Sequence, residues 1–306
     1  KHHRSWVNSL GAEWRNELQL GSENLLATSL YQPLDASHRF FLEPRLVWSR
    51  NWEYVFLDGE RLARYRLSDV GGGVDTGINL NNRAQARIGY LYTRRDVEVN
   101  TGSPLMPEVE RNDAGLSASF TFDSRDTPFN ATRGGAAALE YFRSEESLGA
   151  EAPYDRFEGT ATVALPLDRN VGYLRVSGGS SFDTDLPLYD TFSLGGPISM
   201  PGLAIGELRG TSYWSAQASY LWRIADISYI FGQSIFAGLK FTAADMGGRI
   251  DGVSASPIYS GAFVLAGRTL LGPLSLSLAG TSSSEWQLVL GLGRPIEEGT
   301  INDLGW

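Results

Sequence analysis

The stretch Gly115–Asp123, with the sequence GLSASFTFD, decides the fold of this chain. Apolar and polar side chains alternate along it, which is the two-residue period of a β-strand that has one apolar and one polar face. One face carries Leu116, Ala118, Phe120 and Phe122, and the other carries Ser117, Ser119, Thr121 and Asp123. We therefore predict a strand here.

The same alternation recurs along the whole sequence. It is clearest from Trp214 to Ile224, and it returns in Ala84–Tyr92, Leu274–Leu278 and Trp286–Leu292. No apolar pattern with a period of 3.6 residues persists for three turns, so no long amphipathic helix is expected. The sequence predicts an all-β protein.

Composition excludes several functional classes. The chain has 306 residues, a net charge of −9 and no cysteine. The acidic excess argues against a nucleic-acid partner, and the lack of cysteine excludes a disulfide framework, a thiolate metal site and a cysteine nucleophile. No run of about eighteen apolar residues predicts a membrane-spanning helix, and residues 1–11 lack the apolar region of a signal peptide.

Two architectures can carry so many alternating strands, namely a soluble β-sandwich and a transmembrane β-barrel. Charged residues at mid-strand positions, such as Arg39, Glu43 and Arg45, favour the barrel because a water-filled lumen tolerates them. Turns that alternate between short and long, and aromatic residues near strand ends, favour it too. We predict an outer-membrane barrel of a Gram-negative bacterium, with a soluble sandwich and a porin as weaker alternatives.

The alternation predicts fifteen strands, at residues 1–8, 12–20, 24–32, 38–57, 61–79, 83–99, 108–124, 134–146, 153–166, 170–182, 212–225, 234–245, 257–270, 273–282 and 285–294. Single-chain bacterial barrels have an even number of strands. We therefore expect a 16-stranded antiparallel barrel whose first strand precedes residue 1. Residues 1–306 are then one transmembrane β-barrel domain, the C-terminal part of a longer protein.

Three short motifs resemble those of a known family. The segment Ser124–Phe129, followed by Arg133 and Gly134, resembles the periplasmic turn between strands eight and nine of the bacterial surface antigen superfamily. This superfamily comprises the sixteen-stranded outer-membrane barrels of assembly factors and two-partner-secretion transporters. Ser193–Gly196 with Met200–Leu203 resembles its long sixth loop, and Asp245–Gly247 resembles the Asp-x-Gly of the strand that faces this loop. The residues carried over from the motifs are Arg125, Asp126, Pro128, Arg133 and Gly134 in the turn, and Gly195, Gly196, Pro201, Gly202, Arg209, Asp245 and Gly247 in the loop and the facing wall.

The loop departs from the family pattern at one position. Most members have Val-Arg-Gly there, and the arginine contacts an acidic residue of the barrel wall. Here Pro201 occupies the place of that arginine, and proline has neither a charge nor a backbone N–H. Arg209, further along the loop, is the candidate substitute.

Together with Phe40–Arg45 and Asp58–Arg61, this divergent loop resembles the barrels of patatin-like autotransporters. That resemblance implies an outer-membrane anchor, and a translocator if a passenger crosses, for a patatin-like lipid hydrolase that precedes a POTRA module in the same chain. The implied partners are outer-membrane lipid, the POTRA module, the passenger and the barrel assembly machinery, and a homo-oligomer stays open. The alternative is a protein-export or assembly barrel that acts on separate client proteins.

Residues 183–211 form a connection too long for an ordinary turn, and they show no strand pattern. The glycine and proline steps at Gly195–Pro197 and Pro201–Gly202 allow sharp reversals. A sixteen-stranded barrel encloses a channel that would leak if it were empty. We expect the loop to fold into the lumen, with a mobile surface loop as the alternative.

The chain contains no recognisable catalytic motif. It lacks Gly-x-Ser-x-Gly, and its three histidines include only one, His38, away from the first residues. We predict no catalytic residue, cofactor or metal site in these residues, so any enzyme activity of the full-length protein depends on upstream sequence. Trp306 matches the aromatic end of many outer-membrane barrels, but the polar tail 295–306 leaves its role open.

Overall fold

A computed structural model describes residues 1–21, 23–57, 59–103, 106–127, 131–225, 235–250, 257–269, 272–282 and 286–292. Fifteen of its strands form one sheet, in the order β1 to β10 followed by β13 to β17, and β11 pairs separately with β12. Each strand in this order follows its neighbour along the chain, apart from the step between β10 and β13. This is the meandering order that alternating strands with short connections produce.

The sheet strands are β1 (His2–Arg4), β2 (Glu13–Gln19), β3 (Asn24–Pro33), β4 (Phe40–Leu57), β5 (Glu60–Leu80), β6 (Ala84–Thr101), β7 (Val109–Asp123), β8 (Gly134–Ser144), β9 (Tyr154–Leu167), β10 (Asn170–Ser180), β13 (Ser212–Ala225), β14 (Ile235–Gly247), β15 (Ile258–Thr269), β16 (Gly272–Thr281) and β17 (Gln287–Leu292). The remaining elements are β11 (Phe192–Leu194), β12 (Leu208–Gly210), the helical turn α1 (Gly196–Ser199) and the 3₁₀ turns η1 (Glu146–Leu148) and η2 (Leu188–Asp190).

The all-β prediction is confirmed, and each of the fifteen predicted strands overlaps one strand of the large sheet. The sixteenth strand, expected before residue 1, stays a prediction, as does the single barrel domain over residues 1–306. Among the described residues, no helix has the length and apolar character needed to cross a membrane.

The prediction that residues 183–211 lack strands is wrong. Phe192 pairs with Gly210, and Leu194 pairs with Leu208, in a small antiparallel sheet. Between these two strands lies the helical turn α1, which has proline in its first turn. Each of the two strands has three residues, which is too short for a two-residue alternation to be recognised.

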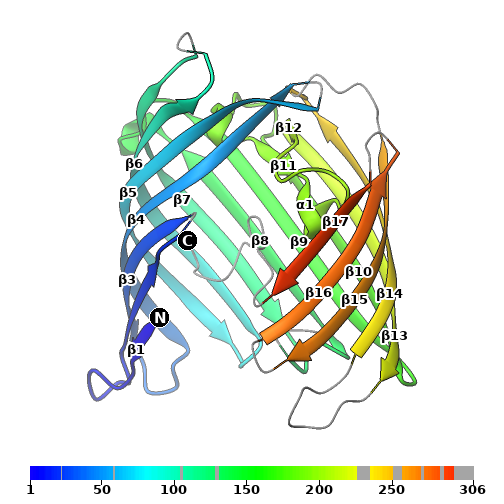
Figure 1. The fold of residues 1–306 in the computed structure, drawn as a ribbon. Helices are drawn as coiled ribbons and strands as arrows, with labels where there is room; N and C mark the ends of the chain where they lie inside the picture. The colour runs from blue at the N-terminus through cyan, green and yellow to red at the C-terminus, as the bar shows by residue number, and fades with distance from the viewer. Residues whose placement is uncertain are drawn as a thin grey trace. The chain divides into compact units, whose positions relative to one another are not determined.

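The described residues group into two compact units. Unit 1 comprises residues 1–122, 139–158 and 180–190, and unit 2 comprises residues 123–138, 159–179 and 191–306. In unit 1, strands β2 to β7 are consecutive antiparallel neighbours (Figure 1). In unit 2, strands β13 to β17 pair in the same way (Figure 1).

Gly71–Gly73 lies in the middle of β5, where the backbone of the neighbouring strand β6 approaches closely. A Cβ atom on Gly73 would lie 2.5 Å from the Tyr90 carbonyl oxygen, and one on Gly71 would lie 2.6 Å from that of Tyr92. The register pairs these glycines with β4 on one side and β6 on the other. They are therefore packing positions in a strand interior, a common role of strand glycine.

Candidate functional site

The candidate site is the long connection 181–211 together with the strands that hold it. Its first part ends in η2, and Asp190 of this turn is held by strands of unit 1. Arg95 Nη1 lies 3.0 Å from Asp190 Oδ1, and the Tyr154 hydroxyl donates to Asp190 Oδ2 at 2.7 Å. Arg156 Nε donates to the Asp190 carbonyl oxygen at 3.2 Å. We call this set of contacts the Asp190 latch.

Arg95 is fixed by further partners around the latch. The Asp69 carboxylate accepts two hydrogen bonds from this guanidinium, from Nε to Oδ1 at 2.8 Å and from Nη2 to Oδ2 at 3.1 Å. The guanidinium carbon also lies 4.5 Å from the centre of the Tyr189 ring, a favourable cation–π geometry. Tyr189 packs in turn against an apolar cluster that contains Tyr65, Leu67 and Val97. The η2 turn is thus held by both ionic and apolar contacts.

The second part of the connection lies in unit 2 and begins with the β11–β12 pair. Arg209 of β12 is only 3% exposed, and its Nη1 donates to Thr191 Oγ1 at 3.2 Å. Its carbonyl oxygen accepts from the Ile250 N–H at 3.1 Å. A buried guanidinium is stable only where its surroundings compensate for lost water. This placement in the loop is compatible with the predicted role of Arg209 as a substitute for the missing arginine, which stays a prediction.

The chain reverses direction at Gly195 through a backbone conformation reserved for glycine. Gly195 has φ 145° and ψ 175°, a region that residues with a Cβ atom avoid. A Cβ atom there would also lie 2.0 Å from the Ala204 carbonyl oxygen. Gly196 follows with φ 80° and starts α1. Both glycines singled out in the sequence are therefore required by the backbone.

Three strands of unit 2 hold this loop through its carbonyl oxygens. Gln217 of β13 donates from Nε2 to the Ile198 carbonyl at 3.0 Å. Lys240 of β14 donates from Nζ to the Pro197 carbonyl at 3.2 Å. The Ser260 hydroxyl of β15 donates to the Pro201 carbonyl. We call these three contacts the wall contacts.

Sequence reasoning missed the residues that make the wall contacts. Gln217 belongs to the polar face of a predicted strand, which was the available signal. A pattern of alternation indicates which residues share a face, but it cannot show which of them meets a loop. Pro201 and Gly202 lie close to strands of this unit, since a Cβ atom on Gly202 would lie 2.9 Å from the Gly280 backbone; their role as lumen-loop residues stays a prediction.

Asp245 lies in a different row from the wall contacts. The register pairs Asp245 with Trp214 and Thr242 with Gln217. Because paired residues share a face, Asp245 falls in the row of Trp214, while Gln217 and Thr242 belong to the face that holds the loop. The Asp245 carboxylate accepts from the Met246 N–H at 2.7 Å, and the Gly247 carbonyl accepts from the Thr211 N–H at 3.0 Å. The role of Asp245 as a loop partner stays a prediction.

Comparison with known families identifies the chain. Residues 10–279 match the Omp85 superfamily domain. The chain belongs to the Omp85 superfamily. This confirms, at the level of the superfamily, the resemblance drawn from the turn and loop motifs, and it makes the chain an outer-membrane β-barrel protein of a Gram-negative bacterium.

Solved structures show the same fold. BamA from Haemophilus ducreyi lacking POTRA domains 1–3 matches with a TM-score of 0.76 at 14% identity, over 95% of this chain and 66% of that chain. CdiB from Escherichia coli matches with a TM-score of 0.63 at 13% identity, over 94% of this chain and 56% of that one. CdiB from Acinetobacter baumannii matches with a TM-score of 0.59 at 12% identity, over 92% and 52%. This Omp85 chain thus spans about two thirds of the BamA chain and about half of the CdiB chains.

No relative was found among curated proteins. The Omp85 fold is supported by two other comparisons, the superfamily match and the structural likeness, both of which cover most of the chain.

The turn 124–133 of this Omp85 chain is organised by Asp126. Its carboxylate accepts from the Thr132 hydroxyl at 2.5 Å and from the Thr132 N–H at 2.9 Å. Gly134 has φ 95°, and a Cβ atom there would lie 2.3 Å from the Ser124 carbonyl oxygen. Arg125 pairs with Asp123 at 2.8 Å, and the Arg133 carbonyl accepts from the Asp126 N–H at 3.2 Å. Pro128 lies outside the described residues.

These bonds make the turn sensitive to acid. The hydrogen bond from the Thr132 side chain, followed by backbone N–H groups, holds the pKa of Asp126 below its ordinary value. The stabilisation is therefore complete above the unfolded pKa of about 3.9 and is lost as the pH falls through the lower folded pKa. We expect the Thr132 amide resonance to titrate with a midpoint below 3.9, as measured by NMR. Asp126→Asn should abolish the titration, and an unshifted midpoint in the unmodified protein would contradict this account.

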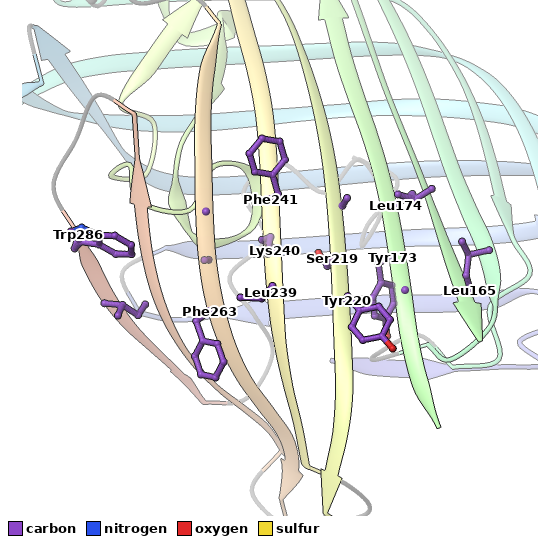
Figure 2. A pocket seen from close by; sticks show the side chains of 15 residues that line it. Leu165, Tyr173, Leu174, Ser219, Tyr220, Leu239, Lys240, Phe241, Phe263 and Trp286 are labelled. Atoms are coloured by element: carbon purple, nitrogen blue, oxygen red, sulfur yellow. The ribbon is translucent and has the colours of Figure 1, made fainter. Parts of the chain in front are cut away.

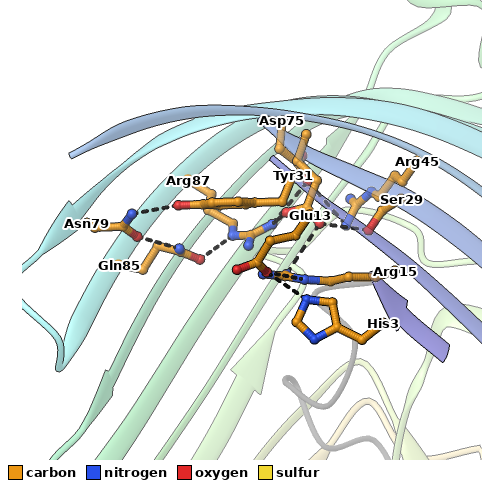
Figure 3. A network of polar contacts seen from close by, with 11 residues as sticks. His3, Glu13, Arg15, Ser29, Tyr31, Arg45, Asp75, Asn79, Gln85 and Arg87 are labelled. Carbon is orange, nitrogen blue, oxygen red and sulfur yellow. Dashed lines mark hydrogen bonds and ion pairs between the residues drawn. The ribbon is translucent and has the colours of Figure 1, made fainter. Parts of the chain in front are cut away.

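A second polar network lies on the same unit as the Asp190 latch (Figure 3). Glu43 accepts from the Ser29 hydroxyl and from Arg87 Nη1, each at 2.8 Å. Arg45 Nη1 lies 3.3 Å from Asp75 Oδ2. Glu43, Arg45 and Asp75 are all buried, so their charges must compensate one another. Arg45 and Glu43 are among the mid-strand charges that favoured a barrel.

This network is balanced by its own charges. Figure 3 also shows His3 and Arg15 on Glu13, at 3.1 and 2.7 Å. Within the described ranges, no group of three or more His, Cys, Asp or Glu side chains is arranged to hold a metal ion. The paired arginines and carboxylates balance the charges on a polar sheet face.

Proposed function

We propose that this Omp85 chain moves a polypeptide across or into the outer membrane, and that the connection 181–211 is the part that moves. The observation that carries the proposal is the way in which this connection is held. It is attached at discrete points, namely the Asp190 latch together with the packing of Tyr189 in unit 1, and the wall contacts in unit 2. Contacts of this kind can be broken and remade without unfolding the strands that supply them.

The second part of the connection has its own small sheet, which supports movement as one body. Phe192, Leu194, Met200, Leu203 and Leu208 are each at most 2% exposed. The β11–β12 pair and α1 give the segment internal backbone hydrogen bonds. A segment with its own sheet can leave the wall as a unit once the contact between the Phe192 ring and the Tyr213 ring of β13, whose centres lie 5.4 Å apart, is also broken.

The latch also has a polarity opposite to that of the family pattern. In the family motif, the loop supplies an arginine and the wall supplies an acid. Here the loop supplies Asp190, and the strands supply Arg95 and Arg156. Pro201, which replaces the loop arginine, contributes only its carbonyl oxygen to the wall contacts. We infer that the Asp190 latch performs the holding role that Pro201 cannot.

The narrower form of the proposal is a passenger in the same chain, a patatin-like lipid hydrolase followed by a POTRA module. The sequence resemblance of Phe40–Arg45 and the divergent loop at Pro201 support it; Asp58 of the other resembling segment lies outside the described residues. The complete reading frame upstream of Lys1 tests it. A Gly-x-Ser-x-Gly motif with a later Asp-Gly, followed by one POTRA-sized module, is the expected result.

The second candidate is a barrel that exports or assembles separate client proteins. The fold likeness to BamA and CdiB favours it, because the superfamily resembled by the sequence includes assembly factors and two-partner-secretion transporters. An upstream region with POTRA-like modules and no hydrolase motif would select this candidate.

A reversible lock tests whether the loop must move. The 306 residues contain no cysteine, so Pro201→Cys combined with Ser260→Cys introduces one pair at a wall contact. In cells that express the complete reading frame, we expect oxidation of this pair to abolish surface exposure or secretion of the upstream polypeptide. Reduction should restore it, as measured by protease accessibility of an epitope placed before Lys1.

Each single-cysteine variant serves as the matched control, since it carries the same substitution without a lock. Loss of thiol labelling reports whether the bond has formed. Transport that continues with the bond formed would overturn the moving-loop proposal and assign the chain the role of a static anchor.

A further inference from the structure

The face of unit 2 opposite to the wall contacts carries an apolar hollow with a volume of about 730 Å³. It lies over strands β9, β10 and β13 to β16, with Trp286 at its edge (Figure 2). This volume falls within the range of about 300–1,000 Å³ typical of small-molecule sites. The residues that line it differ from those that make the wall contacts, except for Lys240.

Strand register explains why the face is hollow at this place. One row across β13 to β16 consists of Tyr220, Leu239, Phe263 and Leu278. The next row consists of Ala218, Phe241, Gly261 and Gly280. Large side chains thus stand beside positions that have a methyl group or none. A Cβ atom on Gly261 would meet nothing within 4 Å.

Aromatic side chains form the rim of the hollow. Trp286 lies over Gly280, where its ring would be 3.1 Å from an added Cβ atom. Trp286 is 73% exposed, Phe241 54% and Phe263 45%, and Figure 2 shows the two phenylalanines on neighbouring strands. In an outer-membrane barrel, the apolar face of the strands meets lipid, so these exposed rings contact hydrocarbon.

We propose that this hollow binds one acyl chain of an outer-membrane phospholipid. The superfamily places the chain in the outer membrane, where acyl chains are the solvent of this face. Lys240 is the one cation among the described residues that line the hollow, and its ammonium group donates to loop carbonyls on the other face. Recognition therefore rests on the hydrocarbon chain and not on the phosphate.

Filling the hollow tests the proposal. Gly261→Leu places a side chain into the open space, while Ala216→Leu adds the same side chain to the same face in the row of Ala243, outside the hollow. The full-length protein in mild detergent is titrated with dipalmitoylphosphatidylethanolamine, and bound lipid is counted by native mass spectrometry. Displacing about two methylene groups should weaken binding about tenfold in Gly261→Leu and leave Ala216→Leu unchanged.

Two further measurements separate the alternatives. Dihexanoylphosphatidylethanolamine has the same headgroup and short chains, and we expect it to bind at least about tenfold more weakly than the dipalmitoyl lipid. Heat-modifiable gel mobility shows that each variant is folded. Equal lipid binding by the two leucine variants would overturn the proposal. So would a dimer of the unmodified protein that Gly261→Leu abolishes, because the hollow would then belong to a second copy of the chain.

Discussion

Gly195→Ala is expected to destabilise the loop by about 3 kcal/mol. Two independent causes act together. The backbone at φ 145° and ψ 175° is strained for any residue with a Cβ atom, and the added Cβ would lie 2.0 Å from the Ala204 carbonyl oxygen. Protease digestion of the full-length protein in detergent should cleave within residues 191–211 at least about a hundredfold faster, the rate that this energy implies if cleavage follows local opening.

Gly261→Ala is the matched control for this prediction. It adds the same methyl group to a glycine of the same unit, at a position where nothing lies within 4 Å. Its cleavage rate should equal that of the unmodified protein. If Gly195→Ala were cleaved by protease as slowly as this control, the account of a tight backbone reversal before α1 would be incorrect.

Asp190→Ala is expected to destabilise the η2 turn by about 3 kcal/mol, at the low end of the range for breaking a buried ion pair. The substitution removes the nearest carboxylate partner of Arg95 Nη1 and the acceptor of the Tyr154 hydroxyl, and leaves Asp113 Oδ2 at 3.9 Å from Arg95 Nη1. We use the low end because Asp190 and Arg95 keep 18% and 17% of their side-chain exposure, and because Asp69 still pairs with Arg95. Hydrogen exchange of residues 181–190, followed by mass spectrometry, should show faster exchange in this segment.

Asp185→Ala provides the control for charge alone. Asp185 belongs to the same connection and is exposed, so its replacement makes the same change in net charge. Exchange in residues 181–190 should stay as it is in the unmodified protein. Similar acceleration in both variants would mean that net charge, and not the Asp190 latch, holds the turn.

If the latch also governs transport, Asp190→Ala and Asp185→Ala should differ in their effect on transport as well. In the complete protein without the cysteine pair, Asp190→Ala should loosen the connection 181–211. In a variant that combines Asp190→Ala with the cysteine pair, we expect transport to depend on reduction as before. Transport without reduction should occur only where the disulfide bond has failed to form. A formed bond should block transport whether or not the latch is present, because the wall contacts then remain closed.

The strands were predictable because alternation is a local property. Gly115–Asp123 shows the alternation within nine residues, and it ends the observed strand β7. The polar rows were predictable as well, since a strand places Glu43 and Arg45 on one face whatever its neighbours are. The glycine reversal at Gly195 was visible from the composition of the loop.

The partners of those residues were not predictable. Arg95 meets Asp190 although 95 positions separate them, and Gln217 reaches a carbonyl of a loop 19 positions earlier. Neither contact follows from a periodic pattern, because each depends on where a non-repetitive segment comes to rest. The Asp-x-Gly motif suggested that Asp245 lies on the strand facing the loop, but it could not show that the register puts Asp245 in the row of Trp214.

By itself, the sequence determined the β class, the number and positions of the fifteen sheet strands and the superfamily motifs, because side-chain alternation and short turn motifs are set by neighbours along the chain. Only the tertiary structure decided that residues 192–194 and 208–210 pair, that Asp190 supplies the acid of the latch, and that Gly261 opens a hollow among large side chains. These features depend on strand register and loop placement, which arise from contacts between residues far apart in the chain.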